Sequence, residues 1–228
     1  MHIMTNNLKH ETAEEVLSTQ LSQYVPSIIG KYLPTETYNA VNSSMFESCR
    51  QIIASGRFNV ESTQQMLVSS MIGFVNEESL REILVDWYFS DHVTDANGVA
   101  IAGIKPTLKQ KHAMVKNIFV SRNISAEKKQ EAMAKLMEID KSELIEQTKA
   151  FTKGAVGSVA EKKLIWDGLF ANDYDKVSLL EHREICAGLC NHAHRDLTSS
   201  FEAEFFDKIE DVVNTKPNNK AEVVFFNL

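Results

Sequence analysis

Hydrophobic residues recur every three or four positions along most of this chain, which is the spacing of one face of an α-helix. In residues 12–33, for example, Leu17, Leu21, Val25 and Ile28 fall on one helical face. The pattern predicts ten helices, at residues 12–33, 36–55, 61–74, 77–90, 105–121, 125–138, 141–153, 159–171, 178–192 and 197–213, and an eleventh that begins near Lys220.

Helix-breaking residues are few, with 9 Gly and 4 Pro among 228 residues, and this favours helices over a turn-rich β protein. Pro26 falls inside the first predicted helix, where we expect it to kink or break the helix. Gly56 follows the second, where we expect it to form the C-cap.

Helix starts are predicted from Ser or Thr followed three residues later by Glu or Gln, the spacing of a capping box. Such pairs mark several separate helices of modest length. They are Thr12 with Glu15, Ser62 with Gln65, Ser158 with Glu161 and Ser178 with Glu181, and Asp140 with Glu143 is a close variant.

The predicted helices are short and amphipathic, and the loops between them are short except for residues 90–106, which carry the turn pair Asn97-Gly98. Helices of this kind bury their apolar faces by stacking in pairs. We therefore expect an all-α fold, a curved array of antiparallel helix pairs of the HEAT or armadillo kind. We expect a single domain over residues 1–228, with 90–106 as a long internal connection.

Net charge is −7 and the densest basic run, residues 105–116, is short, so we expect a solvated helix face there and no nucleic-acid partner. No window approaches the ~18 apolar residues of a membrane span, and the N-terminus lacks a secretory signal. Three cysteines are too few for a disulfide framework. We expect no membrane partner and a cytoplasmic location.

The stretch CAGLCNHAHRD contains two cysteines and two histidines. If it is helical, Cys186 and His194 lie about 12 Å apart along the axis, too far to share one zinc ion. We therefore expect Cys186 and Cys190 to pack in a core, and His192 and His194 to lie at a helix end. A helical zinc enzyme that uses both cysteines and a histidine is the alternative, and it needs ligands from elsewhere in the chain.

Catalytic motifs are absent from the sequence. HETAE at residues 10–14 begins like the zinc motif H-E-x-x-H, but Glu14 stands where the second histidine would be. No two histidines stand four residues apart, and no nucleophile elbow, Walker loop or dinucleotide-binding loop occurs. We expect no catalytic residues and no metal ligands in this chain.

One long segment has a specific order of residues. LMEIDKSELIEQTKAFTKGAVGSVAEKKLIWDGLF places an Asp before a helix, then a break, then Lys and Trp, and REICAGLCNHAHRDLTSSFEAEFFDKI follows. This order resembles the C-terminal helical domain of the aminopeptidase N family of zinc aminopeptidases. The matching residues are Trp87, Asp140, Lys163, Trp166, Gly188, Phe205 and Phe206, and Leu189 stands where the family has an aromatic residue.

The resemblance implies a division of labour. In that family, zinc, H-E-x-x-H and G-A-M-E-N belong to an upstream catalytic domain, so zinc is expected there and no cofactor in this chain. The helical domain covers the active site and shapes the peptide-binding cavity. The resemblance thus implies a non-catalytic domain, part of a larger chain or a stand-alone version of it. Its partners would be its own catalytic domain and the peptide substrate.

A free peptide carboxylate would favour a cationic partner, and Lys109 and Lys111 are the candidates, although exposed lysines on a helix are also ordinary. An array that stops early would leave an apolar face uncovered and would self-associate through it. The alternative function is a free-standing helical-repeat module that binds a protein partner.

Overall fold

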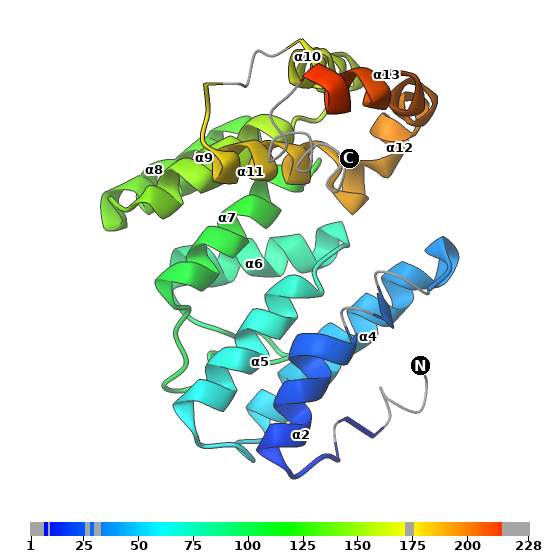
Figure 1. Ribbon diagram of the computed structural model, residues 1–228. Helices are drawn as coiled ribbons and strands as arrows, with labels where there is room; N and C mark the ends of the chain where they lie inside the picture. The colour runs from blue at the N-terminus through cyan, green and yellow to red at the C-terminus, as the bar shows by residue number, and fades with distance from the viewer. Residues whose placement is uncertain (1–6, 9, 26–27, 30–32, 172–175, 216–228) are drawn as a thin grey trace. The chain divides into compact units, whose positions relative to one another are not determined.

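The computed structural model describes residues 7–8, 10–25, 28–29, 33–171 and 176–215. Every regular element in these ranges is a helix (Figure 1), and their only β-type pairing is an isolated bridge between Thr94 and Ala100. The prediction of an all-α fold is confirmed. The HEAT-like or armadillo-like arrangement of the helices stays a prediction.

Two compact units make up the chain, Met1–Asn117 and Ile118–Leu228. The boundary falls inside α7, and the long predicted connection lies within the first unit. That the whole chain forms one domain stays a prediction. The first unit holds α2 (Glu14–Thr19), the π-helix η1 (Gln20–Tyr24), α4 (Thr35–Ala54), α5 (Glu61–Gly73), α6 (Glu78–Ser90) and most of α7 (Leu108–Val120).

The described part of the second unit contains four longer helices, then three short helical segments, and then a further long helix. They are α8 (Ala126–Ile139), α9 (Glu143–Gly154), α10 (Val159–Phe170), α11 (Leu179–Leu189), the 3-10 helix η2 (His192–His194), α12 (Arg195–Thr198), the 3-10 helix η3 (Ser199–Phe201) and α13 (Glu202–Thr215).

Trp87 anchors the core of the first unit. Its ring stacks on Phe46 of α4 with centroids 5.8 Å apart, and its indole nitrogen donates to Thr94 Oγ1 over 2.8 Å. Both rings are fully buried. The contact therefore fixes α6 against α4 and holds the first part of the long connection in place.

The long connection is confirmed between Ser90 and Leu108. Asp91 ends α6 in the left-handed region at φ 63°, and Asp95 Oδ1 accepts from the backbone nitrogens of Asn97 and Val99, each over 2.9 Å. An Asp side chain that bonds its own following backbone in this way is a frequent turn former. The loop therefore contains a turn that the Asp95 side chain stabilises.

The core of the second unit surrounds Trp166. This ring lies 5.3 Å from Phe201 and 5.0 Å from Phe170, centroid to centroid. The hydrophobic cluster around it draws on α9, α10, α11 and η3. Its buried members are Ala150, Trp166, Leu169, Ile185, Cys186, Leu189 and Phe201.

Two of the predicted helix starts are confirmed. Ser178 forms a full capping box, because Glu181 N donates to its hydroxyl over 3.2 Å and Glu181 Oε2 accepts from its backbone nitrogen over 2.9 Å. Ser158 caps α10 by accepting from Glu161 N over 3.3 Å. Here the Glu161 carboxylate accepts from the serine hydroxyl instead of the backbone.

The other predicted capping pairs are wrong, although α5 begins at residue 61 as predicted. The helix of Thr12 begins two residues later, and the Glu11 carboxylate accepts from the backbone nitrogens of residues 12 and 13. Ser62 lies inside the first turn of α5, whose N-cap is Val60. Asp140 is not the cap of α9 either. Its carboxylate accepts from the backbone nitrogen and the hydroxyl of Ser142, and Ser142 is the cap.

Some helix bounds also differ from the predictions. The predicted helix 12–33 begins at Glu14 and becomes π-helical in η1. The predicted helices 178–192 and 197–213 are replaced by α11, by short turns and by α13, because Asn191 accepts from Ala193 N and starts a new turn. Pro26 and the helix expected near Lys220 lie outside the described residues. The C-cap of α4 is Ser55, one residue earlier than predicted, and Gly56 follows it with φ 65°.

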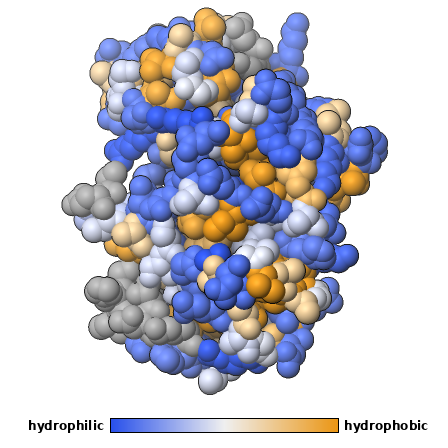
Figure 2. Space-filling view, turned by 180° about the vertical axis from the view of Figure 1, so that it is seen from behind, coloured by the Kyte–Doolittle hydropathy of each residue, from blue (hydrophilic) through white to orange (hydrophobic). Residues whose placement is uncertain are grey.

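The described surface mixes hydrophilic residues with smaller hydrophobic areas, as Figure 2 shows for one face. Leu164 of α10 and Phe206 of α13 are the most exposed large apolar side chains, at 74% and 73%. Within the described ranges, no helix has the length and hydrophobicity to cross a bilayer. The cytoplasmic location stays a prediction.

Candidate functional site

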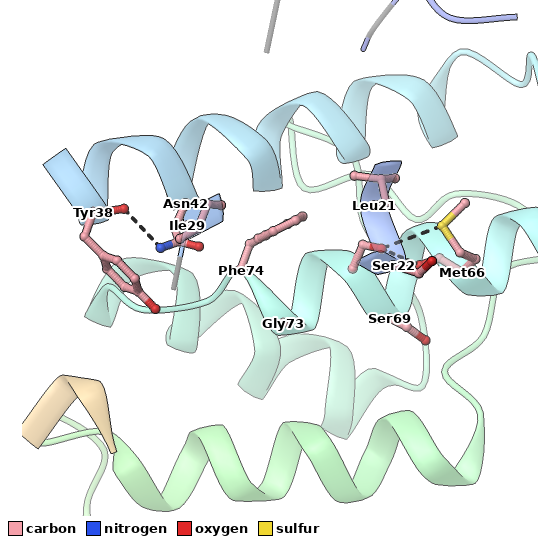
Figure 3. A pocket seen from close by; sticks show the side chains of 10 residues that line it. Leu21, Ser22, Ile29, Tyr38, Asn42, Met66, Ser69, Gly73 and Phe74 are labelled. Atoms are coloured by element: carbon pink, nitrogen blue, oxygen red, sulfur yellow. Dashed lines mark hydrogen bonds between the residues drawn. The ribbon is translucent and has the colours of Figure 1, made fainter. Parts of the chain in front are cut away.

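A pocket with a volume of about 330 Å³ opens in the first unit (Figure 3). Side chains of η1, α4 and α5 form most of its wall, so residues distant in sequence are brought together by helix packing. The lining residues are Leu21, Ser22, Ile29, Tyr38, Asn42, Met66, Ser69, Ser70, Gly73 and Phe74.

One side of the pocket is π-helical. Leu21 and Ser22 belong to η1, where each turn of backbone is wider than in an α-helix. Such π-helical turns are rare and occur frequently at functional sites. Ser22 Oγ donates to Ser18 O over 2.7 Å, so its hydroxyl is bonded to the preceding turn of its own helix.

The other polar groups in this wall also have partners. Asn42 Nδ2 donates to Tyr38 O over 3.0 Å, and Ser70 Oγ donates to Met66 O over 2.9 Å. Because each of these donors bonds its own helix, the pocket offers a mainly apolar wall to a ligand. An apolar side chain is the group that such a wall binds best.

The two predicted peptide-contact lysines lie on α7, and they differ in their surroundings. Lys111 Nζ lies 2.7 Å from Asp91 Oδ1, an ion pair that joins α7 to the end of α6. The hydrogen bond from this lysine lowers the pKa of Asp91. Lys109 is exposed. The role of both residues in peptide binding stays a prediction.

The second unit contains an unusually close helix contact between α9 and α11. A methyl group added to Gly154 would lie 2.7 Å from Leu189 N, and one added to Gly188 would lie 2.9 Å from Ala155 N. Only glycine permits backbones to approach this closely. Gly188, which matches the family pattern, therefore has a structural role at this contact.

Lys162 fills the space beside the two glycines. Its Nζ donates to Gly154 O over 3.2 Å, Gly188 O over 3.3 Å and Leu189 O over 2.7 Å, and the side chain is fully buried. These carbonyls stand at the C-terminal ends of α9 and α11, where helix dipoles favour a cation. Burial lowers the pKa of Lys162 to about 8.

Lys163, the lysine matched to the family pattern, lies nearer the surface. Its Nζ bonds Asp167 of the same helix and Glu204 of α13. Lys208 joins the same group through a contact of 3.5 Å to Asp167 Oδ1. The network connects α10 to α13 through exposed charges, and the hydrogen bonds to Asp167 and Glu204 raise the pKa of Lys163.

Cys186 packs in the core as predicted, because it is fully buried in the Trp166 cluster. Burial raises the pKa of its thiol to about 12, and that of Cys190 to about 11. His194 does lie after the end of α11, but it is buried and its Nε2 lies 2.8 Å from Val120 O at the end of α7.

Within the described ranges, no cluster of three or more His, Cys, Asp or Glu side chains is arranged to hold a metal ion. Lys162 was not among the functional residues predicted from the sequence. Its spacing of four from Trp166 places a lysine on the buried face of α10, and this pattern was visible in the sequence. The pocket residues had no comparable local pattern.

Comparison with other proteins gives no relative: no model of a known family and no characterised protein matches this sequence.

Proposed function

We propose that this chain is the non-catalytic C-terminal helical domain of a zinc-dependent aminopeptidase, and that it covers the active site and shapes the peptide-binding cavity. The observation that carries the proposal is the ordered series of residues from Asp140 to Phe206 in the second unit. Zinc and the reacting groups would belong to a separate catalytic domain.

Several residues of that series have architectural roles. Asp140 holds the cap of α9, Trp166 is the centre of a hydrophobic cluster, and Gly188 allows α11 to contact α9. A domain that forms the wall of a cavity needs such rigid packing and needs no nucleophile of its own. The exposed Lys109 remains available for a peptide carboxylate, whereas Lys111 would have to leave Asp91.

The test is the sequence of the full-length transcript that contains this coding region. The proposal predicts an H-E-x-x-H helix and a G-A-M-E-N motif several hundred residues upstream in the same reading frame. A complete reading frame without either motif would overturn the proposal.

A helical module that binds a protein partner is the second candidate. The apolar pocket of the first unit favours it, because such a pocket can accept one apolar side chain of a partner. In that case the transcript would encode no protease motif. Substituting the pocket residue Met66 with Lys would then abolish partner binding and leave the far-ultraviolet circular dichroism unchanged.

A further inference from the structure

A second pocket, with a volume of about 440 Å³, opens in the second unit near the end of α11. Four aromatic side chains contribute to its wall, together with polar residues from η2, α12 and α13. The lining residues are Trp166, Cys190, His192, Arg195, Thr198, Phe201, Glu202, Phe205 and Phe206. This pocket is independent of the proposed aminopeptidase role.

Two opposite charges on this pocket have no hydrogen-bond or ion-pair partner among the residues that the structure describes. Arg195 and Glu202 are both exposed, and neither side chain has a hydrogen bond or ion pair with another residue in the described ranges. His192 is the remaining ionisable group besides the Cys190 thiol, and burial together with the charge of Arg195 lowers its pKa. A ligand carrying one negative and one positive group would satisfy Arg195 and Glu202 together.

The apolar part of the pocket wall is also exposed in part. Phe206 is 73% exposed, although its ring lies 5.4 Å from that of Phe205. Trp166 is almost fully buried, so Phe206 is the aromatic side chain that an apolar group of a ligand would cover.

We propose that this pocket binds a free apolar α-amino acid. The side chain lies among Phe201, Phe205 and Phe206, the carboxylate binds Arg195, and the ammonium binds Glu202. The volume is within the range of about 300–1,000 Å³ typical of small-ligand sites. A zwitterion pairs with both Arg195 and Glu202, whereas a singly charged ligand pairs with only one of them, and aromatic faces also attract the ammonium.

Isothermal titration of the purified chain with L-phenylalanine, 3-phenylpropionate and 2-phenylethylamine tests the proposal. The first has both charges, and the others lack the ammonium and the carboxylate respectively. We expect L-phenylalanine to bind, and each analogue to bind about tenfold or more weakly. Absence of L-phenylalanine binding, or equal affinity for the three probes, would overturn the proposal.

Two charge variants identify the site. Arg195→Gln should weaken L-phenylalanine about tenfold without changing the affinity for 2-phenylethylamine, and Glu202→Gln should weaken L-phenylalanine without changing the affinity for 3-phenylpropionate. Arg183→Gln on α11 and Glu210→Gln on α13 are matched controls, since both residues are exposed and outside the pocket. Losses of the same size in the controls would contradict the assignment.

Discussion

Gly154 of α9 and Gly188 of α11 lie so close to the backbone of the opposite helix that neither position has room for a side chain. A methyl group on Gly154 would overlap the carbonyl oxygen of Ile185, and one on Gly188 would overlap that of Phe151. The neighbouring atoms are backbone, so they cannot rotate away. This contact fixes the distance between the two helices around which the second unit is built.

Gly188→Ala should therefore destabilise the protein strongly. Overpacking of a core costs about 1–3 kcal/mol, and a clash with backbone belongs at or above the upper end of that range. The free energy of unfolding is measured by urea titration. Gly157→Ala is the matched control, because no atom lies within 4 Å of its added methyl group. Equal stability of the two variants would contradict the close-contact interpretation.

Lys162→Met should also destabilise the second unit. It removes the donor to Gly154 O, Gly188 O and Leu189 O and leaves buried carbonyls unpaired. An unsatisfied buried group costs about 1–3 kcal/mol, so a loss of at least this size is expected in the free energy of unfolding. A variant as stable as wild type at neutral pH would show that the three hydrogen bonds do no more than offset the cost of burying the ammonium group.

The stability difference between wild type and Lys162→Met should depend on pH. Burial lowers the pKa of Lys162 from its ordinary 10.5 to about 8, so the folded protein releases this proton at lower pH than the unfolded chain. The unfolded state then binds more protons, and the contribution of this residue to stability rises with pH between about 8 and 10.5. Urea titrations at several pH values in this window should show a widening difference, and a constant or narrowing one would contradict the lowered pKa.

Ser178→Ala should destabilise the protein more than Ser62→Ala does, although both serines have the capping-box spacing in the sequence. Ser178 accepts from Glu181 N, whereas Ser62 lies within the first turn of α5. Loss of an N-cap costs about 0.5–2 kcal/mol, and loss of a hydroxyl within a helical turn costs little. Thermal unfolding of the two variants makes the comparison, and an equal loss in both would contradict the assigned N-caps.

Glu204→Gln should lower the free energy of unfolding only slightly, despite the contacts of Glu204 with Lys163 and Lys208. These side chains are 30–39% exposed, and exposed ion pairs contribute about 0–1 kcal/mol that salt reduces further. The free energy of unfolding of the variant and of wild type is measured in low and in high salt. A loss well above that range, unaffected by salt, would mean that the network is a main support of α13.

The fold class was predictable from the sequence because helical periodicity is local. The N-caps at Ser158 and Ser178 were predictable for the same reason. The start of α2 was not, because the Glu11 carboxylate accepts from Thr12 N, the donor that Glu15 would bond in a capping box, and only the folded geometry decides between the two carboxylates. The α9–α11 contact was not predictable either. A single glycine in a helix gives no indication of which backbone approaches it.

The residues that line the two pockets were even harder to predict from the sequence. Their walls combine residues from several helices, and each residue taken alone has an ordinary helical environment. Arg195 and Glu202 have no spacing that predicts a common ligand. Their position on one pocket follows from the short turns η2, α12 and η3, which separate α11 from α13.

We propose that this chain supplies binding walls and no reactive groups. Incubation of the purified chain with zinc and a fluorogenic aminoacyl substrate is the decisive experiment. We predict no turnover above that of the zinc-containing buffer at any substrate concentration. Saturable hydrolysis that follows the chain through purification and is abolished by a zinc chelator would contradict the claim.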